Sequence, residues 1–196
     1  MTFADTDRDP DPGGRLTYNV ARLLAEGPGA SRVHLVAGVM LDLGDDLRQG
    51  DPLEGEVHLA RTNRGLYVTG RLTTSLEAEC SRCLRDVEIP LAIDLDEEAL
   101  PSIDIVTGLP LDASLEPDAL RLTDHHELEL GRPVRDAISL AEPIAPLCRP
   151  DCPGLCSVCG LELATGPHDH PDTDIDPRLE ALRALLVEPP DGGTPD

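Results

Sequence analysis

Residues 66–95 read LYVTGRLTTSLEAECSRCLRDVEIPLAIDL and contain two stretches in which apolar side chains recur at every second position. Those of the first stretch are Leu66, Val68 and Leu72, and those of the second are Val87, Ile89, Leu91, Ile93 and Leu95. Successive side chains of a strand point to opposite faces of its sheet. The pattern therefore predicts two antiparallel strands, joined by a turn at Ser81–Arg82, with one buried face and one wet face.

Two stretches upstream have the same period, at residues 33–41 and 53–59. Turn residues at 44–46 and 62–65 separate the stretches, as expected between antiparallel strands. We expect at least four strands in one antiparallel meander. The polar residues at alternate positions should line its wet face; they include Glu54, Glu56, His58, Glu88, Asp94 and Asp96.

Helical spacing occurs in three places. Within residues 17–26, Val20, Leu23 and Leu24 predict a short helix that ends at Gly27, and the apolar residues of 130–141 predict a buried helix of about three turns. Residues 176–187 resemble a terminal helix, with Asp176 as its cap. Together these features predict an α+β fold: an antiparallel meander sheet with a few short helices and a C-terminal cysteine-rich segment like a zinc knuckle.

The polarity of the chain suggests where its parts begin and end. Residues 1–14 and 188–196 are expected to be tails, and 15–142 a sheet domain with helices. Within that domain, the acidic stretch near 97–127 loses periodicity and is expected to be a long, partly disordered loop. Residues 143–187 should form a cysteine-rich knuckle followed by the terminal helix.

Charge and composition limit the partners. The chain has 38 acidic and 16 basic residues, a formal charge of −22, and its only aromatic residues are Phe3, Tyr18 and Tyr67. Stacking on bases and bulk attraction to phosphate are therefore disfavoured. The negative charge fits solubility, repulsion from membranes, attraction to a basic protein partner or a general acidic bias, and composition does not distinguish these. There is no secretory signal and no membrane-length apolar run, so we expect a cytoplasmic protein that does not enter a membrane.

Six cysteines in a reducing compartment suggest metal ligands. Cys80 and Cys83 form one C-x2-C pair, and Cys156 and Cys159 form another, which Gly160 follows. Zinc binds four thiolates in a tetrahedron, and such a closed site is structural. Spacing leaves two ligand sets open, although short loops cost less entropy to close and favour the local one. The local set is Cys148, Cys152, Cys156 and Cys159, and the alternative set is Cys80, Cys83, Cys156 and Cys159.

An enzymatic interpretation is the remote alternative. His125 and Glu127, followed by the pair Cys156 and Cys159, superficially match the signature of zinc deaminases. However, Leu155 stands where that signature has proline, and Gly160 would interrupt the helix that should carry the pair. His168 and His170 could bind a metal weakly but are interpreted as part of a polar loop. We expect neither an enzyme nor a small-molecule substrate.

The chain resembles the YceD family, the large ribosomal RNA subunit accumulation proteins. The resemblance rests on the motifs of residues 79–84, 146–161 and 175–178 in this order, and it covers roughly residues 15–187. Ser157 stands where family members that carry the knuckle commonly have proline. The resemblance implies a non-enzymatic role in the accumulation or processing of large-subunit (23S) ribosomal RNA, and hence in ribosome biogenesis.

Two partners are consistent with that role. RNA would need a local basic patch, for which the arginine-rich neighbourhoods are the candidates. They consist of Arg61, Arg64, Arg71, Arg82 and Arg85, which would have to converge on one edge of the sheet. Alternatively, the acidic surface holds a basic ribosomal protein or an assembly intermediate, so that the chain acts as a chaperone-like adaptor.

Overall fold

The computed structural model describes residues 16–44, 47–112, 114, 116–166, 169–170, 178 and 182. The two expected tails fall outside these residues. So does the helix expected at 176–187, of which only positions 178 and 182 are described.

Most of the structure is a twisted sheet with few helices. Its four long strands, each antiparallel to the next, are β2 (Ser31–Val39), β4 (Leu53–Arg61), β5 (Leu66–Glu79) and β6 (Asp86–Leu100). The strands expected from the period-two pattern are confirmed. The short strand β3 (Arg48–Gln49) pairs with β5 opposite Leu76 and Glu77, near the C-terminal end of β5.

The sheet is mixed, which corrects the prediction of a strict antiparallel meander. After β6 the chain makes an excursion through residues 101–119 and returns as β7 (Leu120–Arg121), which pairs with β6 in parallel. The N–H of Leu122 then donates to the carbonyl of Leu100 at 3.0 Å. A two-residue strand has no periodicity of its own, so the local sequence does not reveal it.

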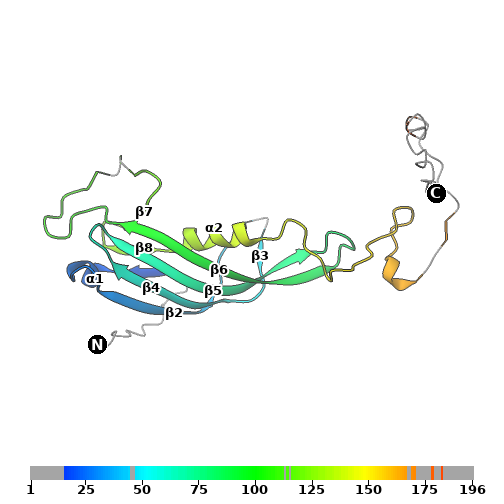
Figure 1. The fold of residues 1–196 in the computed structure, drawn as a ribbon, viewed down its shortest axis with the longest axis horizontal. Coiled ribbons are helices and arrows are strands. Elements are labelled where there is room, and N and C mark those ends of the chain that lie inside the picture. The colour runs from blue at the N-terminus through cyan, green and yellow to red at the C-terminus, as the bar shows by residue number, and fades with distance from the viewer. Residues whose placement is uncertain are drawn as a thin grey trace, which may run out of the picture.

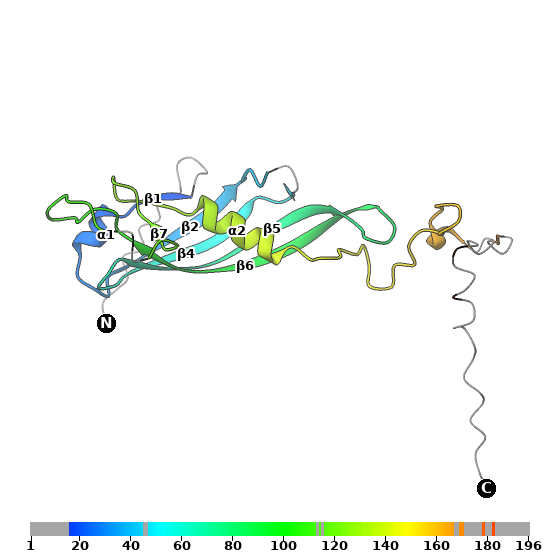
Figure 2. The ribbon, with the colours of Figure 1, turned by 90° about the horizontal axis from the view of Figure 1, so that it is seen from above.

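A second layer covers one face of the sheet (Figures 1 and 2). It consists of β1 (Thr17–Asn19) paired with β8 (Glu127–Glu129), and of the helices α1 (Ala21–Ala25) and α2 (Gly131–Ala141). The core lies between the layers, where fully buried leucines from the sheet meet Leu16, Leu128, Leu130 and Ile138 of the covering elements. None of the helices in the described part of the chain is long and apolar enough to cross a membrane.

The two helices agree with the predicted spacing, with one difference. α2 buries Val134 and Ile138 and ends before Pro143, as expected. The stretch before α1, however, is strand β1 rather than helix, because Thr17 to Asn19 pair with a segment more than a hundred positions further along the chain. That partner is invisible to local sequence patterns.

The acidic stretch 97–127 is more regular than predicted. Residues 97–100 continue β6, and Ala99 and Leu100 are buried. Beyond them, the Asp104 carboxylate accepts hydrogen bonds from the N–H groups of Val106 and Thr107, which closes a turn. The acidic side chains of this stretch thus organise turns and do not only solvate a loop.

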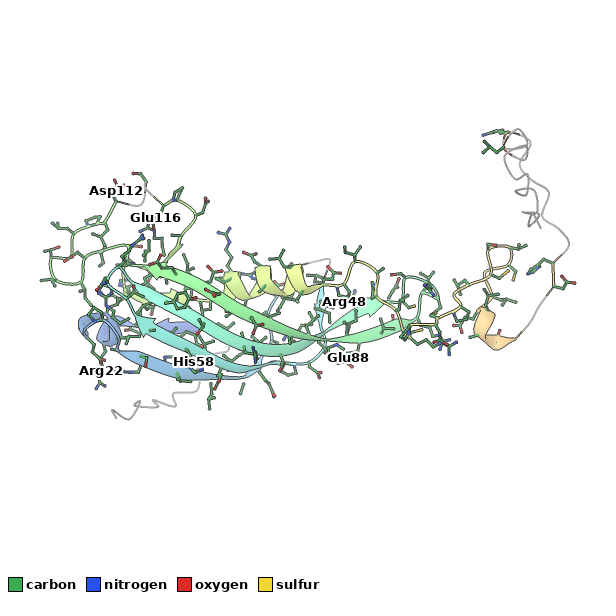
Figure 3. The ribbon with its side chains drawn as sticks, viewed as in Figure 1. Arg22, Arg48, His58, Glu88, Asp112 and Glu116 are labelled. Carbon is green, nitrogen blue, oxygen red and sulfur yellow. The ribbon has the colours of Figure 1, made fainter. Side chains whose placement is uncertain are left out.

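The other face of the sheet is open. All six polar residues expected on the wet face are exposed, which confirms the predicted alternation in β4 and β6. The alternation expected in β2 is wrong: Leu35 is exposed because it lies opposite Glu56 on the open face, whereas Val36 and Val39 are buried and the pairing shifts register between them. Side chains of the sheet are drawn in Figure 3, where His58 is labelled on β4 and Glu88 on β6.

The β5–β6 hairpin positions the candidate site. The two strands pair without interruption from Leu66 opposite Ala99 to Glu79 opposite Asp86. The hairpin extends past the other strands, and residues 142–166 approach its tip (Figure 1). Its turn contains Cys80 and Cys83.

Candidate functional site

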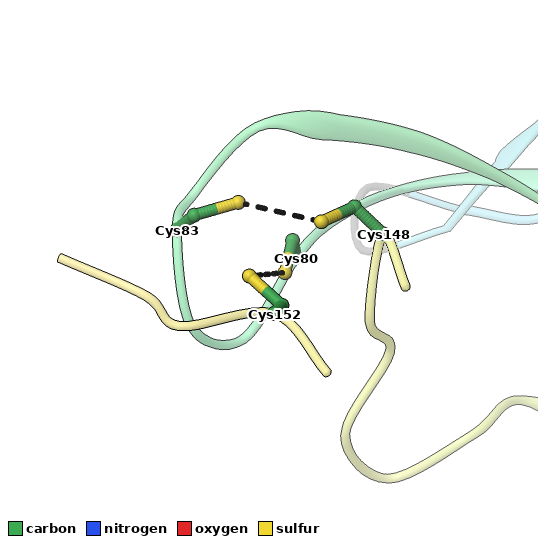
Figure 4. A group of neighbouring side chains, drawn as sticks. All are labelled: Cys80, Cys83, Cys148 and Cys152. Carbon is green, nitrogen blue, oxygen red and sulfur yellow. Dashed lines mark hydrogen bonds between the residues drawn. The ribbon is translucent and has the colours of Figure 1, made fainter. Parts of the chain in front are cut away.

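Four cysteines meet at the tip of the β5–β6 hairpin (Figure 4). Cys80 and Cys83 come from the hairpin turn, and Cys148 and Cys152 come from the segment that follows α2. Their four sulfur atoms all lie within 4.8 Å of one another. The Sγ atoms of Cys80 and Cys152 are 3.9 Å apart, and those of Cys83 and Cys148 are 3.7 Å apart. These distances are far longer than a disulfide bond, so all four are free thiols.

The spacing of the sulfurs fits a tetrahedral metal ion. With Zn–S bonds of about 2.3 Å, the edge of a tetrahedron of thiolates is about 3.8 Å long. The two sulfur–sulfur distances above are of this length. Four thiolates and no imidazole or carboxylate form the donor set of a closed, structural zinc site. The group would hold Zn²⁺ and leave it no open coordination position.

The surroundings of the sulfurs favour thiolates. Cys80, Cys83 and Cys152 are buried, together with partly buried Leu147 and Leu155. The backbone N–H groups of Cys148, Cys83 and Arg82 donate to the Cys80 sulfur and lower the pKa of its thiol from 9.0 to about 6. Backbone donors of this kind are typical of the outer shell of zinc–thiolate sites.

The neighbouring sulfurs have the opposite effect on Cys148. Without a cation, the hydrogen bond with Cys152, burial and the other cysteines raise the pKa of the Cys148 thiol to about 12. Four thiolates therefore cannot coexist here on their own, because like charges at this distance repel one another. A divalent cation bound by all four sulfurs would remove that conflict.

Direct contacts between the hairpin and residues 146–162 accompany the cysteines. The N–H of Ser81 donates to the carbonyl of Pro146 at 2.8 Å, and the N–H of Leu155 donates to the carbonyl of Arg82 at 3.1 Å. The Arg82 guanidinium donates to the Cys152 carbonyl at 2.8 Å. The segment is thus attached to the hairpin by its backbone as well as by sulfur.

The structure groups the cysteines in neither of the two ways expected from the sequence. Each expected set combined two members of the present group with Cys156 and Cys159, which lie apart from the four. The shorter loops of the local set do not decide the grouping, because the long stretch between Cys83 and Cys148 is not a flexible chain. The residues between Cys83 and Cys148 are folded into β6, β7, β8 and α2, so only a short link after α2 remains to be ordered.

Cys156 and Cys159 instead lie with His170, the three ligand atoms all being within 4.8 Å of one another. The structure thus brings His170, which the sequence presents as part of a polar loop or a weak metal ligand, beside the second cysteine pair. Ten residues separate Cys159 from His170, fewer than the about 12–15 of known C-x2-C…His patterns, so spacing alone does not identify this ligand.

The deaminase alternative is not assembled. His125 lies in a turn beside β8, where its N–H donates to the Thr123 hydroxyl. Within the described part of the chain, neither group of thiols includes His125 or Glu127.

The five candidate RNA-binding arginines do not converge. Arg61 ends β4 and Arg64 lies in the β4–β5 turn, whereas Arg82 and Arg85 lie in the β5–β6 turn. β5 separates the two turns, and its 14 residues span about 43 Å at about 3.3 Å per residue. Arg71 lies between them on the open face.

Each of these arginines already has a protein partner. Arg61 donates to the carbonyls of Leu24 and Gly65, and Arg82 to that of Cys152. The other three form ion pairs, which are Arg64 with Glu116, Arg71 with Asp94 at 3.1 Å, and Arg85 with Glu162 at 2.7 Å. Glu116 lies at the end of the sheet away from the cysteines (Figure 3).

Carboxylates prevail on the open face. Glu54 and Glu56 of β4 are exposed there, and so are Asp94, Asp96 and Glu98 of β6. Arg71 of β5, between the two strands, pairs with Asp94, and the Tyr67 hydroxyl donates to Asp96 at 2.6 Å. That hydrogen bond raises the pKa of Tyr67. We call these five carboxylates the acidic face.

Fold and site together define a sheet-and-helix protein whose long hairpin carries a four-cysteine cluster shared with the segment after its last described α-helix. The chain matches the family model described as "Large ribosomal RNA subunit accumulation protein YceD" over residues 68–186, which include all six cysteines. It therefore belongs to the YceD family, whose name indicates a role in the accumulation of large-subunit ribosomal RNA.

Relatives are found in mycobacteria. An uncharacterized protein of Mycobacterium tuberculosis and one of Mycobacterium bovis are each 35% identical over 176 residues, which are 87% of this chain and 81% of theirs. An uncharacterized protein of Mycobacterium leprae is 28% identical over 182 residues, 91% of this chain and 76% of its own. No solved structure matches the chain.

Proposed function

We propose that the protein promotes the accumulation and processing of large-subunit (23S) ribosomal RNA during ribosome biogenesis, as a non-enzymatic binding or adaptor protein. The observation that carries this proposal is the family match, which spans the hairpin and the cysteine segment. The four-cysteine cluster supports a structural part for zinc in it. A closed tetrathiolate ion would hold residues 146–162 against the hairpin as one rigid surface.

The charge arrangement favours a basic protein as the direct partner. The net charge is −22, and the acidic face presents five carboxylates on a sheet surface that no described element covers. Arginines that would contact RNA are at both ends of a long strand and are bonded to carboxylates or carbonyls. RNA would have to displace those partners. On the acidic face, Arg71 pairs with Asp94 and Arg64 lies 3.9 Å from Glu98, but carboxylates outnumber cations there, so a basic ribosomal protein meets an excess of negative charge.

Recovery from lysate tests the partner class. The tagged full chain is captured with and without nuclease treatment. If the partner is a protein, the same basic ribosomal protein is recovered after nuclease, and it binds the purified chain directly. Loss of that protein with nuclease, together with retention of large-subunit RNA by the purified chain, would contradict the adaptor mode and favour direct RNA contact.

Charge reversal locates the surface. Glu54→Lys with Glu56→Lys changes the acidic face, and Asp124→Lys with Asp136→Lys is the matched control, because it changes the net charge equally at exposed carboxylates outside the acidic face and the cysteine segment. If the acidic face binds the partner, only the first pair weakens binding strongly. Equal weakening by both pairs would indicate bulk charge rather than a surface.

The RNA mode has its own variant. Arg82→Glu with Arg85→Glu reverses the charge at the hairpin turn. Direct RNA contact at this turn predicts loss of binding to purified large-subunit RNA, while the adaptor mode predicts that binding to the ribosomal protein persists. Zinc content must be measured in this variant, because Arg82 also donates to the Cys152 carbonyl.

A further inference from the structure

The loop of residues 156–160 has the geometry of the hairpin turn that holds Cys80 and Cys83. In the hairpin turn, the N–H of Leu84 donates to the carbonyl of Cys80 at 2.9 Å, and Leu84 has a φ of +58°. In the second loop, the N–H of Gly160 donates to the carbonyl of Cys156 at 2.9 Å, and Gly160 has a φ of +73°. Both C-x2-C pairs are therefore folded into the same tight turn.

In both turns, a backbone N–H group donates a hydrogen bond to the sulfur of the first cysteine. The N–H of Arg82, two residues after Cys80, donates to the Cys80 sulfur. The N–H of Val158, two residues after Cys156, donates to the Cys156 sulfur at 3.4 Å. Backbone donors directed at a cysteine sulfur stabilise its thiolate, which is the form that binds metal. The second loop is thus preorganised as half of a metal site.

His170 supplies a third ligand from eleven positions beyond Cys159. One of its ring nitrogens and the sulfurs of Cys156 and Cys159 all lie within 4.8 Å of one another. One ion can touch three atoms at this spacing, with Zn–S of about 2.3 Å and Zn–N of about 2.0–2.1 Å. Cys156 and His170 are partly buried and Cys159 is exposed, so the trio is accessible to an incoming ion.

The loop is also held in place independently of any ion. The N–H of Cys156 donates to the carbonyl of Leu161 at 2.8 Å, and Leu155 pairs with Glu162 as a bridge. The 3-10 helix η1 (Leu163–Thr165) follows, and the N–H of Leu163 donates to the carbonyl of Gly154. These bonds fix the spacing of the two cysteines before a metal arrives.

From this geometry we infer that the chain has a second Zn²⁺ site, formed by Cys156, Cys159 and His170 and separate from the four-cysteine cluster. Two thiolates and an imidazole favour zinc over the hard cations, which prefer oxygen ligands. Zinc binding releases the thiol protons of Cys156 and Cys159 and leaves one position of a tetrahedron for a further ligand. The ion would tie the loop of residues 156–160 to His170.

Zinc counting on the reduced full chain tests the inference. The protein is loaded with Zn²⁺, dialysed against a chelator of moderate affinity and analysed for metal per chain. We expect two zinc ions in the unmodified protein and one in the variant with Cys156→Ser and Cys159→Ser. His170→Ala should also retain one, whereas His125→Ala, which removes an exposed histidine outside the trio, should retain two.

Cobalt spectra keep the two sites distinguishable. With Co²⁺ in place of zinc, loss of the trio should leave the spectrum of a tetrathiolate ion, and Cys80→Ser with Cys83→Ser should leave that of a site with fewer thiolates. The inference is overturned if the unmodified chain binds a single ion that the Cys156→Ser, Cys159→Ser variant retains. It is equally overturned if the unmodified chain binds a single ion and each pair of cysteine variants binds none, because all the ligands would then belong to one shared site.

Discussion

Replacement of Cys152 by serine should detach residues 146–162 from the hairpin without unfolding the sheet. A structural zinc site contributes roughly 10–16 kcal/mol of apparent binding free energy. One of four equivalent thiolates then accounts for about 2.5–4 kcal/mol, which lowers zinc affinity by about 100- to 1000-fold. The large core between the sheet and its covering layer contains none of the four cysteines, so its stability should change little.

The cost of closing the chain around this site is small, which makes the effect local. Cys83 and Cys148 are 65 positions apart. Closing a flexible loop of that length would cost about 4.3 kcal/mol in chain entropy. α2 ends at Ala141, so only seven residues lead to Cys148, and the corresponding cost is about 2.4 kcal/mol. A metal bound by the four cysteines would therefore hold a short tethered segment to a scaffold that is already folded.

Hydrogen exchange measures the detachment. The amides of Ser81 and Leu155 donate across the junction, to Pro146 and Arg82, and should lose protection in the Cys152→Ser protein while amides in the middle of β5 keep theirs. Cys159→Ser is the matched control, because it removes the same group outside the four and should leave the Ser81 amide protected. Full protection of Ser81 in the Cys152→Ser protein, with tightly bound zinc, would refute this reasoning.

Three further outcomes are expected. In metal-free, reduced protein the lowered pKa of Cys80 means that its thiolate stabilises the docked state fully above about pH 9, and that this stabilisation is lost as the pH falls through about 6. Thiolate absorbance should show one transition near pH 6 that Cys80→Ser abolishes. Persistence of the transition in that variant would assign it to another group. Leu84 has a left-handed backbone and an exposed side chain, so Leu84→Gly should stabilise the docked hairpin by about 0.5–1 kcal/mol. Nearby amides should then exchange more slowly. A loss of stability would show that the Leu84 side chain is needed. A methyl group at Gly65 would lie 2.2 Å from the carbonyl oxygen of Ala99. Gly65→Ala should therefore lower the global free energy of unfolding, measured by denaturant titration, by about 1–3 kcal/mol. An unchanged denaturation midpoint would contradict the close packing of this turn.

Local patterns were sufficient for the long elements. β4, β5 and β6 are long enough for their period-two alternation to be read directly, and α2 has both a buried stripe and a proline after its end. β1, β7 and β8 have only two or three residues each, and partners far along the chain define them. Residues 97–100 were predicted as loop because acidic side chains interrupt the alternation, although the strand continues through them.

The sequence by itself determined the strands of the hairpin, the excess of negative charge, and the presence of two C-x2-C turns, because each of these follows from neighbouring residues. Only the tertiary structure decided which sulfurs meet. Folding of β6, β7, β8 and α2 brings Cys148 and Cys152 to a turn more than sixty residues earlier, and it directs Cys156 and Cys159 to a histidine. The tertiary structure also shows that the arginine pairs lie at opposite ends of β5. The length of this extended strand keeps them apart although they are close in sequence.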